Sequence, residues 1–350
     1  MKHLELHILQ SFPVACLNRD DLNSPKTAIF GGVQRARVSS QSWKRAIREY
    51  AQENSERFKG QRTRLIVEPL RAALIKEGVT ESEALDHAKK LADAISKLDE
   101  KAEKNGKQQV KTLFFTTPAE IQALARAFKE TGDTKKAIKA VGPEVLKDAA
   151  DIALFGRMVA SDHSLTIEGA AMFAHALSTH KVDNEIDFFA AVDDLQPKEE
   201  SGAGMTGTLE FNSATYYRFA ALNLDMLKDK DHLVVLSPDE RKQIVRTFVE
   251  AALLAVPGAR KNSMNAATTP GYVLGIVRGS GHPVQLVNAF EKQTRPFGGK
   301  GLFECSLEAL KAEYEKLNDT WGMKKRELVN VSIPDEKLDA FLDKVVAHVD

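Results

Sequence analysis

Hydrophobic and polar residues alternate at the start of the chain. Leu4, Leu6 and Ile8 are separated by single polar residues. Successive side chains of a strand point to opposite faces, so this period of two predicts a half-buried strand up to residue 12. Residues 16–32 then carry Asn, Asp, Ser-Pro and Gly-Gly steps, which predict a loop.

An amphipathic helix is predicted over residues 40–53. Ser39 and Ser40 offer hydroxyl groups for its N-cap. At 100° per residue, one face is apolar and the opposite face is basic. The apolar face holds Trp43, Ala46, Ile47 and Tyr50, and the opposite face holds Gln41, Lys44, Arg45 and Arg48.

Residues 60–155 are predicted to form a helical insertion in the main domain. Thr80–Glu83 and Thr117–Glu120 have the spacing of capping boxes, and apolar residues follow each at intervals of three and four. The charged stretch 97–109 between these helices is typical of a solvated linker.

The rest of the chain alternates between strand and helix patterns. Residues 165–185 fit either a strand or a helix, and the Gly- and Pro-rich residues 194–208 predict a flexible arm or loop. Strands are predicted at 211–227 and 271–277, and helices after a capping box at 237–240, at 306–318 and within 334–349. This order predicts an α+β fold, a split βαβ arrangement with an antiparallel sheet backed by two helices.

Composition narrows the class of protein. Hydrophobic residues make up 43% and charged residues 28%, which excludes a fully disordered chain. No apolar run is long enough to span a membrane, and the first residues lack the apolar region of a secretory signal. The two cysteines, Cys16 and Cys305, form no disulfide framework, so a cytoplasmic location is expected.

Charge is segregated along the chain although the total is zero. Residues 18–48 carry seven cations and two acids, and residues 255–300 carry six cations and one acid. Residues 183–200 carry seven acids and one cation. A polyanion is therefore a candidate ligand of one face, with ordinary surface variation as the alternative.

The densest candidate site lies at residues 33–48. Arg35 and Arg37 share one side of an extended segment, and the serine-rich start of a basic helix follows. Helix N-termini, Arg side chains and hydroxyls all bind phosphate, so contact with a nucleic-acid backbone is predicted. An ordinary basic surface remains the alternative. Arg260 and Lys261 follow a helix end, where complementing the helix dipole is the favoured interpretation of this block taken alone.

Motifs for metal binding and catalysis are missing from the sequence. There is no GxxxxGK[ST], HExxH or GxSxG motif. Asp20–Asp21 and Asp193–Asp194 have the chemistry of nuclease metal ligands, but such pairs are more often loop or capping residues. We therefore expect no catalytic residue, no metal and no cofactor.

The segment 7–48 resembles the CasC family, the CRISPR RNA-binding backbone ("Cas-seven") subunit of type I-E CRISPR Cascade. The resemblance continues at residues 151–158, 174–195, 210–227, 256–270 and 288–292. It implies an RRM-like (ferredoxin-like) palm formed by residues 1–59 and 156–350. It also implies a thumb hairpin at about 183–212 within the palm, and helical fingers inserted at 60–155.

The resemblance also implies a function. Members of the family are non-catalytic, polymerise along the guide RNA spacer, grip its phosphate backbone and present guide segments for pairing with target DNA. The implied partners are CRISPR RNA, further copies of the chain, and the other Cascade subunits: the RNA-processing endoribonuclease, the capping subunit, and the large and small subunits. The alternatives are a metal-dependent endoribonuclease on an RRM-like scaffold, using Asp20 or Asp21, and a purely structural assembly protein.

By position in the matching segments, the resemblance implies three groups of RNA contacts. Met158 would be an apolar wedge against bases, and Arg260 and Lys261 would form a basic loop near the RNA. The palm group consists of Arg19, Lys26, Arg35, Arg37, Ser39, Ser40, Gln41, Lys44, Arg45 and Arg48. The acidic, Gly-rich stretch 197–204 departs from the family, so the thumb side chain that contacts RNA stays open.

Overall fold

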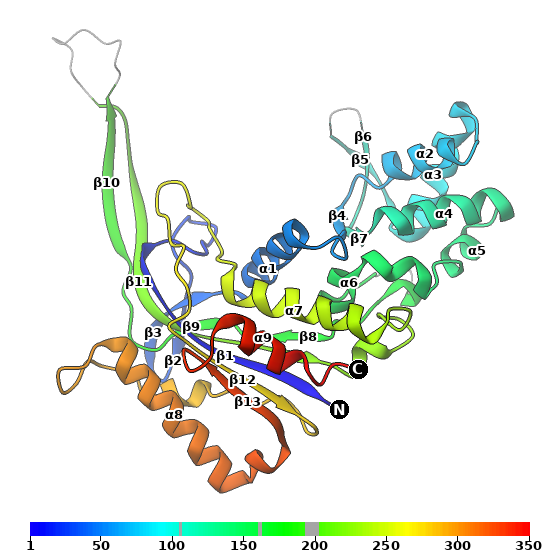
Figure 1. Ribbon diagram of the computed structural model, residues 1–350. Helices are drawn as coiled ribbons and strands as arrows, with labels where there is room; N and C mark the ends of the chain where they lie inside the picture. The colour runs from blue at the N-terminus through cyan, green and yellow to red at the C-terminus, as the bar shows by residue number, and fades with distance from the viewer. Residues whose placement is uncertain (105–106, 160–162, 193–202) are drawn as a thin grey trace.

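A large antiparallel sheet forms the centre of the molecule (Figure 1). The computed structural model describes residues 1–104, 107–159, 163–192 and 203–350. Within them, nine strands join in the order β13-β12-β1-β11-β9-β3-β2, and β8 and β10 also pair with β11. These strands are β1 (His3–Ala15), β2 (Thr27–Phe30), β3 (Val33–Val38), β8 (Ala171–Phe173), β9 (Ala176–Ser178), β10 (Glu185–Val192), β11 (Ala203–Asn223), β12 (Tyr272–Arg278) and β13 (Glu327–Ile333). The predicted α+β class with an antiparallel sheet is confirmed.

Strand β1 is buried on both of its faces. Leu4, Leu6 and Ile8 pack into a core beneath α1 (Ser40–Asn54), α7 (Pro238–Leu254) and α9 (Leu338–Val346). Glu5 and His7 point to the other face, where they are equally buried. The prediction of a half-buried strand is therefore wrong, because the polar positions face a second covered layer rather than solvent.

The second layer consists of α8 (Leu302–Trp321), the short helix η5 (Val287–Phe290) and the segment that precedes it. Its apolar core lies against the sheet residues Leu9, Tyr217 and Tyr272. The sheet is thus enclosed between two helical layers. A ligand of the enclosed part of the sheet would therefore bind over a helix or at an edge of the sheet.

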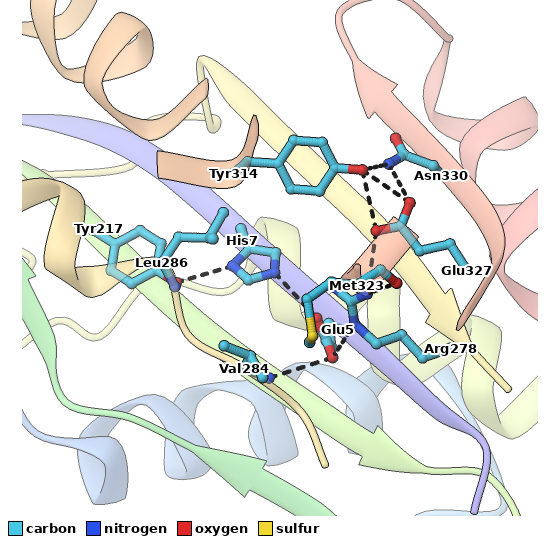
Figure 2. Close-up of polar contacts among 10 residues, drawn as sticks. All are labelled: Glu5, His7, Tyr217, Arg278, Val284, Leu286, Tyr314, Met323, Glu327 and Asn330. Atoms are coloured by element: carbon cyan, nitrogen blue, oxygen red, sulfur yellow. Dashed lines mark hydrogen bonds and ion pairs between the residues drawn. The ribbon is translucent and has the colours of Figure 1, made fainter. Parts of the chain in front are cut away.

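Buried polar groups fasten this layer to the sheet (Figure 2). The backbone N–H of Leu286 donates to the Tyr217 hydroxyl at 2.9 Å. That hydroxyl also forms a hydrogen bond with His7 Nδ1 at 2.9 Å. The other ring nitrogen, His7 Nε2, lies 3.5 Å from Glu5 Oε2.

Arg278 continues the same network toward α8. Its Nε donates to Glu5 Oε1 at 2.8 Å, and Nη1 donates to Glu327 Oε1 at 3.2 Å. Glu327 in turn accepts a hydrogen bond from the hydroxyl of Tyr314 on α8, at 2.9 Å. These bonds join the sheet to α8, so the network serves as a structural connection between the layers, while Glu5 Oε2 and His7 Nε2 make no hydrogen bond.

A helical lobe with its own apolar core projects from the sheet (Figure 1). It contains α2 (Val67–Lys76), α3 (Glu81–Ile95), α4 (Pro118–Thr131) and α5 (Thr134–Lys139). Thr117 caps α4 as predicted, accepting from the N–H of Glu120 at 3.2 Å. Thr80 makes no side-chain cap bond and instead donates to Glu83, so that capping prediction is wrong in its geometry.

The lobe also contains short strands that the sequence pattern missed. The predicted linker at 97–109 is part of a hairpin, β5 (Leu98–Lys104) with β6 (Lys107–Val110). β4 (Gln61–Thr63) pairs with β7 (Phe114–Thr116). Helix α6 (Ala150–Phe155) lies within the predicted insertion but packs into the core of the sheet. The domain boundaries themselves stay a prediction.

A long hairpin of β10 and β11 extends from the sheet (Figure 1). β11 is longer than the strand predicted at 211–227, because it begins at Ala203, inside the segment expected to be a loop. Residues 193–202, and Asp193 and Asp194 with them, lie outside the described residues. The open prediction at 165–185 resolves into β8 and β9. None of the described helices combines the length and apolarity needed to cross a membrane.

Candidate nucleic-acid interface

Helix α1 presents the predicted basic face because its apolar face is anchored. Ser39 Oγ accepts from the N–H of Ser42 at 3.3 Å and starts the helix. Trp43 and Ile47 are buried, and the Arg218 guanidinium lies 3.6 Å from the Trp43 ring centroid. Ser39 is itself only 7% exposed, so its hydroxyl acts as a cap within the fold.

Three cations meet where α1 faces the helical lobe. The guanidinium groups of Arg48 and Arg62 lie 5.3 Å and 4.6 Å from the centroid of the Phe115 ring, and the Lys44 ammonium lies 5.5 Å from that of Phe173. Aromatic faces stabilise these cations. We call Lys44, Arg48 and Arg62 the junction cluster.

The junction cluster holds positive charge that no neighbouring acid neutralises by direct pairing. Within the described part of the chain, no hydrogen bond or salt bridge joins any of the three side chains to another residue. Burial, and then the charge of Arg62, lower the pKa of Lys44; burial, and then Arg48, lower that of Arg62. An anion bound here would relieve this repulsion.

Arg62 was missed by sequence reasoning. It lies in β4, inside the region predicted as a helical insertion, and only the stretch QRTR at 61–64 marks it. The pairing of β4 with β7 brings it over Phe115. This proximity comes from tertiary structure and left no periodic signal.

Positive charge continues to the N-terminus of α1. The Ser40 N–H donates to His175 Nδ1 at 3.2 Å. Burial, and then the charges of Arg37 and Lys26, lower the pKa of His175, which favours the neutral imidazole that can accept this bond. Arg37 donates from Nε to the Thr27 carbonyl at 3.1 Å and remains partly exposed. Four of the predicted residues therefore lie around the N-terminus of α1: Lys26, Arg37, Ser39 and Ser40.

A groove of about 540 Å³ borders the other side of α1. Arg19, Arg45 and Lys261 line it, together with Asn18 and Ser42. Arg45 pairs with Glu49 at 2.7 Å on the surface, so its charge is partly compensated.

Arg260 has a partner within the protein and adds less to the groove. Its Nη2 donates to the Asn23 carbonyl at 3.3 Å, which ties two loops together. Gln41, like Lys261, is exposed.

The predicted contact of Arg35 with RNA has to be corrected, because the residue is buried. Its side chain is 0% exposed, and its guanidinium donates to the carbonyls of Phe30, Ser178, Phe290 and Glu291 at 2.8–3.3 Å. Four carbonyl oxygens hold the cation inside the protein, where it joins β3 to the layer containing η5. It has no surface left for a phosphate.

Met158 is 83% exposed and, with Leu22 and Phe297, is among the most exposed large apolar side chains of the described residues. It lies between two buried residues, Arg157 and Val159, directly after α6. Its exposure fits a contact with an apolar partner such as a base.

Of the candidate metal ligands, Asp20 has a structural role. Asp20 Oδ1 accepts from the N–H groups of Leu22 and Ser24 at 2.9 and 3.0 Å, which shapes the loop. Among residues that the structure describes, no group of three or more His, Cys, Asp or Glu side chains is arranged to hold a metal ion.

Comparison with known proteins places this geometry in a family. The model of the CT1975-like protein family matches residues 4–347, and the chain belongs to this family. A search among curated proteins gave no match.

Two solved structures are similar over the full length. A chain of a "CRISPR RNA-guided surveillance complex, pre-nicking" is 28% identical with a TM-score of 0.80, covering 99% of this chain and 100% of the other. A chain of a "CRISPR RNA-guided surveillance complex" is 26% identical with a TM-score of 0.70, covering 99% of each chain. The family and the structural matches together show a CRISPR protein of the Cas-seven type.

Proposed function

We propose that this chain is the non-catalytic CRISPR RNA-binding backbone subunit of a type I-E Cascade surveillance complex. The observation that carries the proposal is the junction cluster, three cations without direct acidic partners beside an exposed helix face. The similarity of the chain to chains of RNA-guided surveillance complexes supports RNA as the polyanion that binds there.

The proposed contacts are to the RNA backbone. Cations and the amino end of a helix bind phosphate regardless of the base attached to it. A protein that delegates sequence recognition to base pairing needs only such contacts, because it must accept any guide. Lys44, Arg48 and Arg62 would hold one part of the strand, and Lys26 and Arg37 the next.

The fold supports an RRM-like palm at residues 1–59 and 156–350. Strands β12, β1, β11 and β9 adjoin in that order, all antiparallel, and α1 and α7 lie over one face. This strand order and the helices over one face support a split βαβ sandwich. The lobe at 60–155 would be the fingers, and the β10–β11 hairpin the thumb at about 183–212.

The proposed partners follow from this role. Several copies would polymerise along the guide spacer in the cytoplasm, with target DNA recruited through the guide and the other Cascade subunits at the ends and along the filament. The alternative of a metal-dependent endoribonuclease gains no support from Asp20, whose carboxylate already binds loop amides.

Replacing the junction cluster tests the proposal. In Lys44→Ala/Arg48→Ala/Arg62→Ala, co-expressed with a CRISPR array, we expect little or no spacer-length RNA to co-purify with the chain. With purified protein and RNA, the slope of log affinity against log salt should fall by about 2, at roughly 0.7 per lost phosphate contact.

The matched control is Lys324→Ala/Lys325→Ala/Arg326→Ala. It removes the same charge from the exposed turn after α8, on the opposite side of the sheet from α1. It should keep the RNA and the salt slope. Equal losses in both variants would reduce the effect to net charge, and RNA cleavage by the wild-type chain with Mg²⁺ would favour the enzyme instead.

A further inference from the structure

We propose that the buried Glu120–Arg157 ion pair is a positioning pair. It holds the Met158 side chain exposed at the surface, where it can contact a nucleic-acid base. The inference rests on the proposed function, since it assigns Met158 a base of the bound RNA. Neither Glu120 nor Arg157 would touch RNA itself.

The pair connects the helical lobe to the segment that carries Met158. Arg157 Nη1 lies 2.7 and 2.8 Å from the two carboxylate oxygens of Glu120, in the first turn of α4. The Arg157 side chain is 3% exposed and that of Glu120 is 0% exposed. Removing either partner would leave the other charge buried and uncompensated, so the arrangement has few alternatives.

Further bonds fix both partners in place. The Thr116 hydroxyl donates to Glu120 Oε2 at 2.6 Å. Arg157 also donates to the carbonyls of Leu165 and Phe115 at 2.8 and 3.0 Å, and its guanidinium lies over the Phe114 ring. The orientation of the guanidinium is thereby determined on several sides.

The backbone around Met158 is held in an extended conformation. The N–H and carbonyl of Arg157 pair with the carbonyl and N–H of Ile167 at 2.8 and 2.7 Å. The Val159 N–H donates to Thr166 Oγ1 at 3.2 Å, and the Val159 side chain is buried in the core of the lobe. Since side chains alternate in extended backbone, inward-facing Arg157 and Val159 force Met158 outward.

The same anchor connects the segment that carries Met158 to the junction cluster. Phe115 accepts a bond from Arg157 through its carbonyl, while its ring lies against Arg48 and Arg62. One residue of β7 thus links the cations that would hold phosphate to the segment that presents Met158. An apolar side chain held in this position would unstack one RNA base at the same position in each bound copy of the protein.

Base unstacking along the RNA tests the inference. Complexes are assembled on spacer-length RNAs that carry 2-aminopurine at one position each, because its fluorescence rises when the base unstacks. In the wild type we expect bright positions at a regular interval. Glu120→Gln should lose this pattern to the level of Met158→Ala, while RNA affinity and salt slope stay at the wild-type values.

Glu81→Gln is the matched control. It removes the same charge from an exposed ion pair with Arg71 in the same lobe and should keep the pattern. If Glu120→Gln fails to fold, Thr116→Val gives the same test, because it removes only the hydroxyl that orients Glu120. In the Thr116→Val complex, the regular pattern of 2-aminopurine fluorescence should also weaken.

The outcomes separate this inference from the proposed function. A wild-type pattern in a folded Glu120→Gln or Thr116→Val variant, together with a lost pattern in Met158→Ala, overturns the positioning pair alone. A wild-type pattern in Met158→Ala also overturns it, while RNA binding persists. Failure of the wild-type chain to hold RNA overturns the proposed function itself.

Discussion

Charged side chains in this protein differ in role according to what surrounds them. Lys44 and Arg48 lie half-buried against aromatic rings and keep their charge available. Arg35 has the same chemistry but is enclosed by carbonyl oxygens. Residue type alone therefore could not separate a ligand-binding cation from a structural one.

Asp151 is a buried acid directly behind the junction cluster. Its carboxylate accepts from Gln52 Nε2 at 2.9 Å and from the Gly60 N–H at 3.0 Å. Burial raises its pKa from the ordinary value of 3.8 to about 6, although Gln52 and the charge of Arg48 act in the opposite direction. The folded protein therefore holds this proton more tightly than the unfolded chain does.

We predict that Asp151 lowers stability as pH rises. Its contribution is greatest below its unfolded pKa and is lost as pH rises through about 6. From about pH 4.5 to about pH 7, wild type should lose about 2 kcal/mol of unfolding free energy relative to Asp151→Asn. Urea unfolding at both pH values measures this, and parallel pH profiles for the two proteins would contradict it.

At the scale of elements, α1 combines a structural cap with a binding surface. The sequence predicted its bounds and its two faces well, because both depend on neighbours along the helix. Ser39 caps the helix by accepting a hydrogen bond from the Ser42 N–H. Ser40 lies at the same end of the helix, and its N–H donates to His175.

Two substitutions at Ser39 separate these roles. Ser39→Ala should lower the free energy of unfolding by about 1 kcal/mol, because the cap bond is lost. Ser39→Asp keeps a capping oxygen and should retain the stability, but its negative charge should weaken RNA binding. Thermal unfolding and RNA titration measure the two effects. Unchanged RNA affinity in a stable Ser39→Asp would place the RNA away from this helix end.

At the scale of the whole molecule, polar groups as well as apolar cores hold the layers together. Tyr217 connects the η5 segment to β1, since its hydroxyl bonds both the Leu286 N–H and His7. Those contacts close this side of the sheet, so the basic face of α1 lies on the opposite side.

Tyr217→Phe should therefore loosen one layer and leave RNA binding intact. It removes a hydroxyl with two buried partners, at a cost of about 1–3 kcal/mol. Hydrogen exchange should show lower protection in the segment around Leu286 and β1, with no change in the salt slope of RNA binding. Reduced RNA affinity in the folded variant would mean that the two sides of the sheet are coupled.

The sequence by itself determined features that depend on near neighbours. Strand β1, the faces of α1, the cap at Thr117 and the basic segment at 18–48 all follow from local periodicity and residue type. The α+β class followed from the order of these elements.

Only the tertiary structure decided which charges lie at the surface and which meet. Arg62 joins Arg48 because β4 pairs with β7, and Arg35 is buried because η5 covers it. Glu120 and Arg157 form their pair across 37 residues of chain. Such contacts depend on long-range packing, which leaves no periodic pattern in the sequence. The segment that carries the candidate site was therefore predictable, but the exact set of residues at its surface was not.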